Sequence, residues 1–410
     1  MLDVEFCRRQ FPSFSHESTS LWAFFENAGG SYVPASVSDW LHRCFTQYKV
    51  QPYGTTEMSI RAGAEMDMAY QKIAELINAR EEEITLGPST TMNVYILAQA
   101  IRATLEEGDE IIVTNQDHEA NIGAWRRLEQ SGIRIRQWNI DPESGELDTA
   151  DLAKIVSEKT RLVCFSLCSN IVGTVNDCHT VSDIAHDAGA QVVADGVSYA
   201  PHHVVDVKKL GADFILFSTY KTFGTHQGVL WGDREALAQL PGQSHYFNED
   251  SPHYRMNPAG PQHAQIAALN GVFDYYEAVY NHHFDEKKPG LHQRATDVFG
   301  LFSQHETILA NKLLDYLRGN PLVRLIGQDH AAPGERVATI SFITLRKPVA
   351  DVAGRLAQRF VGVGCGNFYA ERCVEALGIP GHSEVIRVSM VHYNTEREVD
   401  RLIEGLDATI

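Results

Sequence analysis

The chain has 410 residues, of which 44% are hydrophobic, enough to bury one large core or two smaller ones. Its formal net charge is −18, so it lacks the basic surface that broad nucleic-acid binding requires. No apolar run reaches the ~18–20 residues needed to cross a bilayer, and the first residues, MLDVEFCRRQ, contain no apolar signal core. We therefore expect a cytoplasmic protein that binds neither nucleic acid nor a membrane.

The seven cysteines are odd in number and widely scattered, which does not suggest a disulfide framework in a chain of this length. Cys164 and Cys168 have a C-x3-C spacing, but Cys164 lies within the strand-like run RLVCFSL. Buried, reduced thiols are therefore favoured over a metal site, and we predict no metal centre.

The first chemical feature in chain order is a turn that enters a helix. LGPSTT, residues 86–91, precedes the helical run MNVYILAQAI. Small and hydroxyl residues at a helix start leave backbone N–H groups free at the positive end of the helix dipole, which suits a phosphate group. Ser89 and Thr90 are candidates for such a site, although serine and threonine also cap helices that bind nothing.

Short apolar runs alternate with helical periodicity through the middle of the chain. Strands are predicted over residues 110–115, 161–167, 191–196, 213–219 and 228–232, and helices over 148–159 and 181–190. Strands that are apolar throughout and separated by helices indicate a mostly parallel sheet covered on both faces. In such sheets ligands bind at the carboxyl ends of the strands.

Polar residues follow several of these strands. His118 comes after the first, where it could cover a flat ring or serve only the fold, and Asn170 lies in the turn after the second. Asp195 ends the third strand, where a buried carboxylate needs a partner such as a protonated ring nitrogen, unless it caps a helix. Lys221 follows the fourth in FSTYKTFG and, taken alone, could equally be a solvated lysine in a turn.

Together, a phosphate turn, a histidine, a buried carboxylate and a lysine at strand ends of one sheet are the equipment for pyridoxal 5′-phosphate (PLP). A lysine forms a Schiff base with the cofactor aldehyde, and a carboxylate keeps the pyridine nitrogen protonated so that the ring accepts electrons from Cα. Lys221 and Asp195 are predicted to have these roles. The released lysine can also move protons at Cα.

The C-terminal part has a different organisation. Strands are predicted over 337–345 and 385–393, with a helix over 349–360 between them. A last helix begins with the capping box Thr395-x-x-Glu398. These elements predict a small α+β unit.

The boundary before this unit is predicted within 285–300, a charged segment that contains Pro289 and Gly290. We therefore divide the chain into an N-terminal segment, 1–20, a large cofactor-binding domain, 21–285, and a small C-terminal domain, 286–410.

Four segments carry a resemblance to a known family: NAGG (27–30), DHEANIGAW (117–125), SNIVGT (169–174) and VVADGVSYAPHHVVDVKKLGADFILFSTYKTFG (192–224). The chain resembles class V aminotransferases of PLP fold type I, in the group of cysteine desulfurases and selenocysteine lyases, closest to the uncharacterised cysteine desulfurase-like branch. The resemblance covers nearly the whole chain. It implies an α/β enzyme with a mostly parallel seven-stranded sheet flanked by helices and a small C-terminal α+β domain, acting on an amino acid as a homodimer with shared active sites.

The resemblance also implies roles for single residues. Lys221 is the Schiff-base lysine, and His118 stacks on the cofactor ring and assists proton transfer. Arg387 matches the arginine that binds the substrate α-carboxylate, a task that suits a bidentate guanidinium, although it could also be a solvated strand-edge residue. The other cofactor contacts that it implies are Asp195, Ser89, Thr90, Asn170, Ser198, Ser218 and Tyr220, the last of which is histidine in the desulfurases. The small residues at the start of NAGG allow close backbone approach, so Asn27, Ala28 and Gly29 are expected at the substrate mouth.

The chain departs from the family in VGVGCGNFYAERC, residues 361–373. Desulfurases carry there a cysteine that attacks the substrate sulfur, and Tyr369 stands in its place, where it could orient substrate or pack as a lid. Cys365 and Cys373 lie four residues to either side. This favours C–S lyase, β-elimination or transamination chemistry; a true desulfurase that uses Cys365 or Cys373, and an amino-acid epimerase, remain alternatives.

A second departure lies in MNPAGPQHAQ, residues 256–265, where the family has a glycine–threonine phosphate contact from the partner subunit. Gly260 stands at the position of the threonine, so this contact falls to the backbone, Gln262 or His263. A non-catalytic relative is a further alternative, but Lys221 and Arg387 are retained. An unrelated nucleotide-binding enzyme would need a GxGxxG or GxxxxGK[ST] turn, which the sequence lacks.

Overall fold

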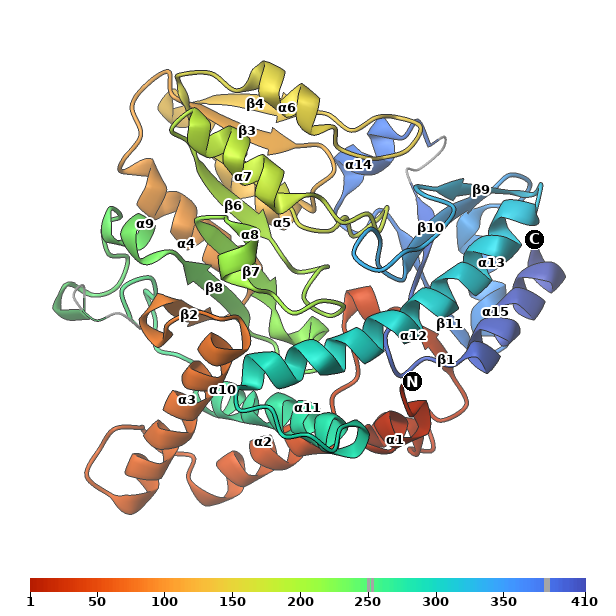
Figure 1. Ribbon diagram of the computed structural model, residues 1–410, viewed down its shortest axis with the longest axis horizontal. Coiled ribbons are helices and arrows are strands. Elements are labelled where there is room, and N and C mark those ends of the chain that lie inside the picture. The colour runs from red at the N-terminus through yellow and green to blue at the C-terminus, as the bar shows by residue number, and fades with distance from the viewer. Residues whose placement is uncertain (249–250, 252–253, 380–383) are drawn as a thin grey trace.

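The larger of two sheets forms the centre of the molecule (Figure 1). The computed structural model describes residues 1–248, 251, 254–379 and 384–410. The strand order of this sheet is β2-β8-β7-β6-β5-β3-β4, and every neighbouring pair is parallel except the two that involve β8. Its strands are β2 (Ile84–Gly87), β3 (Glu110–Thr114), β4 (Arg134–Trp138), β5 (Thr160–Ser166), β6 (Gln191–Asp195), β7 (Phe214–Ser218) and β8 (Gly228–Gly232). The predicted mostly parallel, seven-stranded sheet is confirmed.

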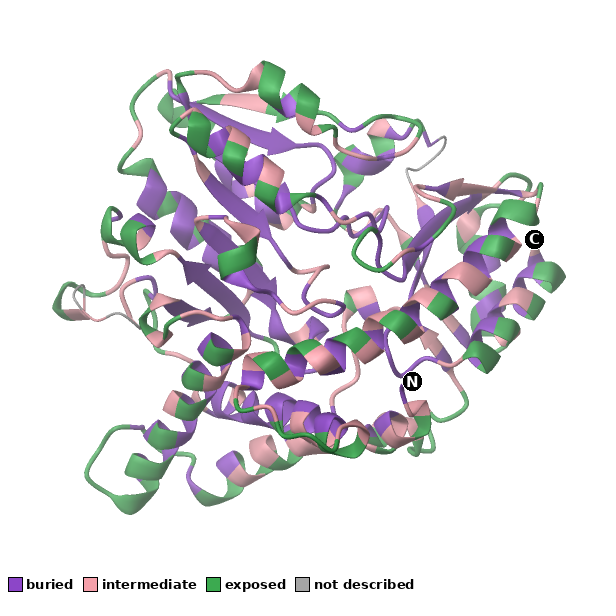
Figure 2. Ribbon diagram, viewed as in Figure 1, coloured by how far each residue is buried: buried purple, intermediate pink, exposed green. Residues whose placement is uncertain are grey.

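Helices cover both faces of this sheet because successive strand residues point to opposite sides. On β6, Val193 belongs to a core cluster with residues of helices α4 and α5, whereas Val192 belongs to a separate cluster with residues of α3, α7, α10 and α11. Figure 2 shows the strands as a buried layer between helices that are exposed on their outer sides. The helices of this part are α2 (Ala35–Gln47), α3 (Glu57–Leu76), α4 (Thr90–Arg102), α5 (Glu119–Arg126), α6 (Thr149–Ile155), α7 (Cys178–Asp187), α8 (Val207–Leu210), α9 (Arg234–Ala238), α10 (His263–Ala268) and α11 (Asn270–His283), and α1 (Val4–Arg9) precedes them.

The helix predicted over 148–159 is shorter than expected, since α6 ends at Ile155. Val156 is extended, and the Ser157 N–H donates to Thr160 Oγ1 at 2.9 Å, so a local turn replaces the last helical residues. Serine and threonine side chains commonly compete in this way with a helix end.

The second sheet has the order β1-β11-β12-β10-β9. Its strands are β1 (Ala23–Phe25), β9 (Val323–Ile326), β10 (Thr339–Thr344), β11 (Val361–Gly366) and β12 (Val385–Ser389), and α13 (Val349–Ala357), α14 (Glu371–Ala376) and α15 (Glu396–Thr409) accompany them. The capping box of α15 is present, with Thr395 and Glu398 each bonded to the other's backbone N–H.

One segment differs from the predicted division of the chain: β1 pairs in parallel with β11, so residues 23–25 complete the second sheet and not the first. Ala23 and Phe25 are buried in its core, which explains their position.

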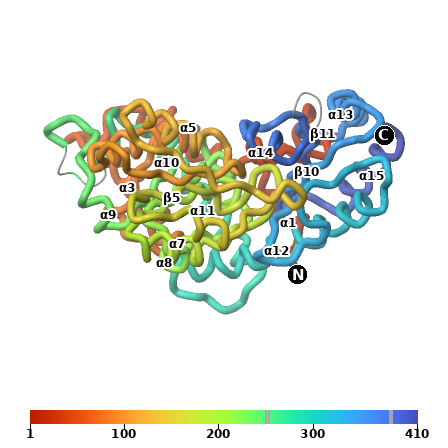
Figure 3. Tube along the Cα trace, turned by 90° about the horizontal axis from the view of Figure 1, so that it is seen from above, coloured from red at the N-terminus to blue at the C-terminus, as the bar shows by residue number. Residues whose placement is uncertain are grey.

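Helix α12 (Leu291–Gly319) runs along both units. Its Val298 and Phe302 belong to the core of the larger sheet, and its Leu309 and Leu313 belong to the core of the second. In Figures 1 and 3, α13 and α15 lie at one end of the molecule, and α3 and α9 lie at the other. Within the described residues, no helix is both long enough and apolar enough to cross a membrane.

Candidate active site

The carboxyl ends of six strands lie at one edge of the larger sheet. Strand β8 is antiparallel to both β2 and β7, so those two strands point the same way as β3, β4, β5 and β6. A pocket opens at this edge. Its lining contains every predicted cofactor contact: Ser89, Thr90, His118, Asn170, Asp195, Ser198, Ser218, Tyr220 and Lys221.

Lys221 ends the short 3-10 turn Thr219–Lys221 that follows β7. The turn is held by the Thr219 N–H, which donates to Gln227 O at 3.0 Å, and by the Gly224 N–H, which donates to Thr219 O at 2.8 Å. A Cβ on Gly224 would lie 2.9 Å from Leu269 Cδ2, so a side chain there would collide with the core. The tight turn places the lysine inward instead of on the surface.

The Lys221 side chain is largely buried and lines the pocket, and its ammonium nitrogen has no hydrogen bond or ion pair with any described residue. Burial and the positive charge of Arg387 lower the pKa of Lys221 to about 8, against the opposing effect of Asp195. A buried amine that loses its proton this readily is suited to bond an aldehyde.

Asp195 is buried at the last position of β6. Its Oδ1 accepts the Val197 N–H at 2.8 Å, and no hydrogen bond from a described residue reaches Oδ2. Burial raises the pKa of Asp195 to about 7. A carboxylate with one free oxygen in such surroundings gains most from a cationic N–H partner.

His118 both caps helix α5 and lines the pocket. Its Nδ1 accepts the Ala120 N–H at 2.9 Å, so the neutral ring carries its proton on Nε2. Burial, followed by the charges of Lys221 and Arg387, lowers the pKa of His118 to about 4. His118 therefore presents a neutral, flat ring to the pocket. This position agrees with a residue that caps the helix and with a residue that covers a cofactor ring.

The phosphate turn lies at the start of α4. Ser89 is its N-cap and accepts the Met92 N–H at 3.1 Å, while Thr90 and Ser218 share a hydrogen bond of 2.7 Å between their hydroxyl oxygens. Strand β8 starts against this turn, and a Cβ on Gly228 would lie 2.3 Å from the Ser89 carbonyl carbon. Only glycine allows this contact, which joins the turn before α4 to the start of β8, where Gly228 pairs with Ser218 at the end of β7.

Arg387 reaches the same region from β12 of the second sheet. It is buried, its Nη1 donates to Asn170 O at 3.2 Å, and its Nε has no partner among the described residues. Its guanidinium carbon lies 3.7 Å from the centre of the Phe368 ring. Burial lowers the pKa of Arg387 to about 10, which leaves it cationic at neutral pH. The alternative of a solvated strand-edge arginine is wrong, because the side chain is buried between the two units.

The remaining substrate candidates separate into two groups. Tyr369 is exposed, and its ring centre lies 5.3 Å from that of His118. None of the five substrate candidates, Arg387, Tyr369, Asn27, Ala28 and Gly29, belongs to the described lining of the pocket. The Asn27 side chain instead donates to Ser389 O at 2.7 Å and accepts from the Tyr393 hydroxyl, and the Ala28 N–H donates to Ser389 Oγ at 2.8 Å. These bonds join the turn Asn27–Gly29, which follows β1, to the end of β12 and to Tyr393.

Several residues of the pocket were not predicted. Ser166 ends β5 and Cys168 follows it, Thr91 is the last residue of the turn 86–91, and His226 stands two residues before β8. The position of His226 could have been predicted, because an antiparallel strand begins at the edge where its parallel neighbours end. That inference requires knowing that β8 is antiparallel, which its apolar sequence does not show.

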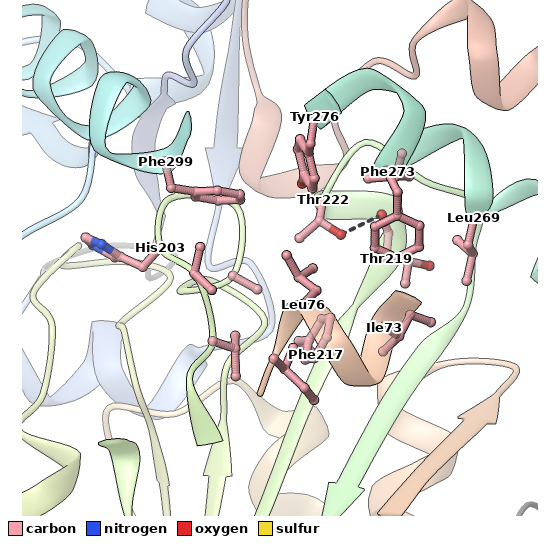
Figure 4. Close-up of a pocket in the computed structure, with 15 residues that line it drawn as sticks. Ile73, Leu76, His203, Phe217, Thr219, Thr222, Leu269, Phe273, Tyr276 and Phe299 are labelled. Carbon is pink, nitrogen blue, oxygen red and sulfur yellow. Dashed lines mark hydrogen bonds between the residues drawn. The ribbon is translucent and has the colours of Figure 1, made fainter. Parts of the chain in front are cut away.

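A second cavity lies behind the lysine turn and is almost wholly apolar (Figure 4). Phe217, Leu269, Phe273, Tyr276 and Phe299 are among its lining side chains. Figure 4 shows the hydroxyl of Thr222 bonded to Thr219 O, a contact of 3.2 Å on the two sides of Lys221. Such a cavity offers nothing to a phosphate group, so a phosphorylated cofactor belongs in the polar pocket on the other side of the turn.

The residues of the polar pocket fit PLP. An unpartnered buried amine, a buried carboxylate with a free oxygen, a neutral ring and a helix N-terminus with hydroxyl groups lie around one space. The fold and this pocket define a PLP-dependent enzyme of fold type I. The family model of class-V aminotransferases matches residues 23–302 and 299–402, and the chain belongs to that family, in its cysteine desulfurase-like group.

Comparisons with curated proteins agree with this assignment. The chain is 34% identical to the "aminotransferase-like protein FGM3" of Gibberella zeae, over 99% of this chain and 98% of that protein. It is 30% identical to the "cysteine desulfurase-like protein ustD" of Aspergillus flavus, over 100% of this chain and 91% of the relative. Among solved structures, the cysteine desulfurase CsdA of Escherichia coli is 22% identical, with a TM-score of 0.84 over 100% of this chain and 98% of the other, which shows the same fold.

Proposed function

We propose that the protein bonds PLP through Lys221 and acts at Cα and Cβ of an amino acid without passing sulfur to a cysteine. The reaction would be C–S lyase or β-elimination chemistry, or transamination. The observation that carries this proposal is the unpartnered amine of Lys221 in one pocket with Asp195 and His118, with the exposed Tyr369 ring beside His118. The thiol that lines the pocket, Cys168, is buried, and burial raises its pKa to about 12.

Each residue has a task that its surroundings support. Bound PLP supplies an electron sink for the bonds at the substrate Cα. Asp195 Oδ2 holds the proton on the pyridine nitrogen, and the ring of His118 covers one face of the cofactor and excludes water. Arg387 holds the substrate α-carboxylate. Lys221, with its lowered pKa, takes up and returns the proton at Cα.

The two cysteines nearest to Tyr369 in sequence support a reaction without a sulfur relay. Cys373 is buried, and burial raises the pKa of its thiol to about 12. Cys365 is exposed on β11, and the pKa of its thiol is raised to about 11, mainly by partial burial. Thiols with raised pKa values contain little thiolate at neutral pH and are poor nucleophiles.

We also propose a homodimer. Exposed apolar side chains on α3 and α4, at Met58, Ile60, Met68, Met92 and Tyr95, offer a surface for a second copy near the phosphate turn. Residues 256–265 of that copy would then complete the phosphate site, and light scattering on the purified protein tests the oligomeric state. A cytoplasmic location and the division at residues 20 and 285 also remain predictions; the seven cysteines, all free, support a reducing compartment.

The first experiment is a visible absorbance scan of the purified protein with and without added PLP, repeated with a panel of amino acids. We expect an absorbance band in the violet region that is lost in Lys221→Ala. The amino acids that shift this band define the substrate class. Lys159→Ala, a change in an exposed lysine at the opposite end of β5, is the matched control and should keep the band.

The products then distinguish the candidate reactions. A keto acid that forms in many turnovers together with ammonia indicates elimination, whereas one equivalent per protomer that continues only after a second keto acid is supplied indicates transamination. Release of sulfide with alanine from cysteine would instead indicate a desulfurase, and Cys365→Ser and Cys373→Ser would identify the thiol. No band after addition of PLP would contradict the proposal and favour a non-catalytic relative.

A further inference from the structure

The predicted phosphate site, formed by Ser89, Thr90 and Ser218, needs groups that balance the negative charge of a phosphate. A phosphate monoester carries about −1.5 to −2 charges at neutral pH and is bound best where a cation or several N–H donors face it. The described pocket lining contains three basic side chains: His118, Lys221 and His226. His118 lies at the ring face and Lys221 at the aldehyde, so His226 is the remaining base.

His226 is held between the two segments that form the phosphate corner. Its ring stacks on Tyr220, with 4.6 Å between ring centres and an interplanar angle of 2°. Its Nδ1 lies 3.1 Å from Pro88 O, in the turn that continues into Ser89 and Thr90. The histidine thus joins the lysine turn to the start of α4, and both segments contribute hydroxyl groups to the same pocket.

The contact with Pro88 settles which ring nitrogen carries a proton. A backbone carbonyl only accepts hydrogen bonds, so Nδ1 of His226 must be the donor. The neutral ring then has a bare Nε2, which cannot donate to a phosphate oxygen. A hydrogen bond between Nε2 and a phosphate dianion therefore needs one additional proton on the ring.

We propose that His226 is a phosphate-binding residue of this site, and that it binds the cofactor phosphate through a protonated Nε2. This inference rests on the proposed placement of PLP in the pocket. At pH 8 phosphate monoesters are dianionic. A neutral ring that binds one takes up a proton from solvent, which stays on Nε2 between the ring and the phosphate oxygen.

Other groups in the pocket can also bind or release protons when a ligand binds. A comparison of two ligands distinguishes their contribution from that of His226. The titratable side chains that line the pocket with it are His118, Cys168, Asp195, Tyr220 and Lys221. PLP and pyridoxal carry the same ring and the same aldehyde, so both ligands perturb these five groups alike. Only PLP has the phosphate, and the difference between the two ligands therefore reports on the phosphate corner.

The experiment measures the affinity of the cofactor-free protein for PLP and for pyridoxal by absorbance titration, in wild type, His226→Gln and His226→Arg. A charge-assisted hydrogen bond predicts about a 10- to 100-fold weaker affinity of His226→Gln for PLP, with little change for pyridoxal. His226→Arg, which keeps a cation, should recover much of the preference for PLP. His179→Gln, a change in an exposed histidine on α7, is the matched control.

Calorimetry at pH 8 in two buffers of different ionisation enthalpy gives a second readout. The wild type should take up about one more proton with PLP than with pyridoxal, and His226→Gln should lose that difference. If His226→Gln lowers the affinities for PLP and pyridoxal equally, the histidine only supports Tyr220, and the inference is overturned. An unchanged affinity for PLP would also overturn it. If the wild type binds neither ligand, the proposed cofactor site itself fails, which is a distinct result.

Discussion

Lys221 and Asp195 show how burial at the carboxyl edge of the larger sheet alters the chemistry of ordinary side chains. Desolvation disfavours the charged form of each, so the pKa of the lysine falls to about 8 and that of the aspartate rises to about 7. Their mutual attraction opposes both shifts without cancelling them. Each group is therefore prepared to exchange a proton near neutral pH.

The raised pKa of Asp195 predicts a pH dependence of stability in the cofactor-free protein. The pKa of Asp195 in the folded protein lies above the value of 3.8 for an exposed aspartate, so protonation of this carboxyl favours the folded state. The contribution of Asp195 to stability is therefore complete below about pH 4 and is lost as the pH rises through about 7. Asp195→Asn should therefore increase the free energy of unfolding at pH 8 by about 2 kcal/mol and change it little at pH 4.

Urea unfolding at the two pH values measures this effect. Asp39→Asn, a change in an exposed aspartate of α2, is the control and should alter stability equally little at both. A loss of stability in Asp195→Asn at pH 8 would show that the carboxylate has a cationic partner in the cofactor-free protein.

The pKa of Lys221 predicts how the rate of PLP incorporation varies with pH. Only the unprotonated amine attacks the aldehyde, so the rate should rise through about pH 8 and level off above it. The positive charge of Arg387 is one cause of the lowered pKa, so Arg387→Gln should move the profile to higher pH and slow incorporation about two- to threefold at pH 7. Stopped-flow absorbance measures the profile, and Arg355→Gln, on the exposed side of α13, serves as control. A profile that is unchanged in Arg387→Gln would remove Arg387 as a determinant.

At the scale of elements, the turn between β11 and α14 connects the second sheet to the pocket. Phe368 and Tyr369 both have left-handed backbone conformations, with φ of 52° and 58°. The Asn170 side chain donates to Phe368 O at 3.1 Å, and the Glu119 N–H donates to Tyr369 O at 2.7 Å. Asn170 thus holds this turn, in addition to the role at the cofactor ring that we predicted for it.

This turn predicts opposite effects of one substitution on stability and activity. A non-glycine residue in the left-handed region costs about 1 kcal/mol, and the Tyr369 side chain is 75% exposed, so Tyr369→Gly should raise the free energy of unfolding by about 0.5–1 kcal/mol. The same change removes the ring next to His118 and should lower kcat/KM at least tenfold.

The control is Tyr246→Gly, at an even more exposed tyrosine that is absent from the left-handed residues. It should be neutral or slightly destabilising and leave activity unchanged. Thermal unfolding and steady-state kinetics give the two readouts, and full activity in Tyr369→Gly would remove Tyr369 from the substrate site.

At the scale of the whole molecule, α12 makes the two units depend on each other. Its first half packs in the core of the larger sheet and its second half packs in the core of the second sheet. Arg387 must cross from the second sheet to the pocket, so the relative position of the units decides whether substrate and cofactor can meet. A continuous helix shared by both cores is well suited to keep that position.

This arrangement predicts that a destabilising substitution in one core also lowers the stability of the other core. Leu313→Ala, at a side chain with no exposed surface, should lower the free energy of unfolding by about 2–5 kcal/mol. Trp125 and Trp138 are buried against the larger sheet, so their fluorescence should shift to a lower urea midpoint together with the circular dichroism. Ile308→Ala, on the exposed side of α12, should change little. Two separate transitions, with the tryptophan signal unaffected, would show that the units unfold independently.

The sequence alone was sufficient for most of the larger sheet. The apolar runs that became β3, β5, β6, β7 and β8 are local signals, because a strand buried on both faces must be apolar throughout. Strand β4 was missed, since RIRQW lies at the edge of the sheet, where only Trp138 is buried. The lysine and the aspartate were predicted for the same reason, because each directly follows or ends such a strand. The phosphate turn was predicted from the helix that follows it, and strand β2 before it was missed.

What only the tertiary structure decided are contacts between residues far apart in the chain. Asn27 lies 362 positions from Ser389, and the hydrogen bond between them joins the turn after β1 to the end of β12. His226 enters the pocket only because β8 is antiparallel to its neighbours, and Arg387 reaches Asn170 only because the two units pack together. A pattern in sequence reports which face of an element is buried, whereas the partner that covers that face is determined by the packing of the whole chain.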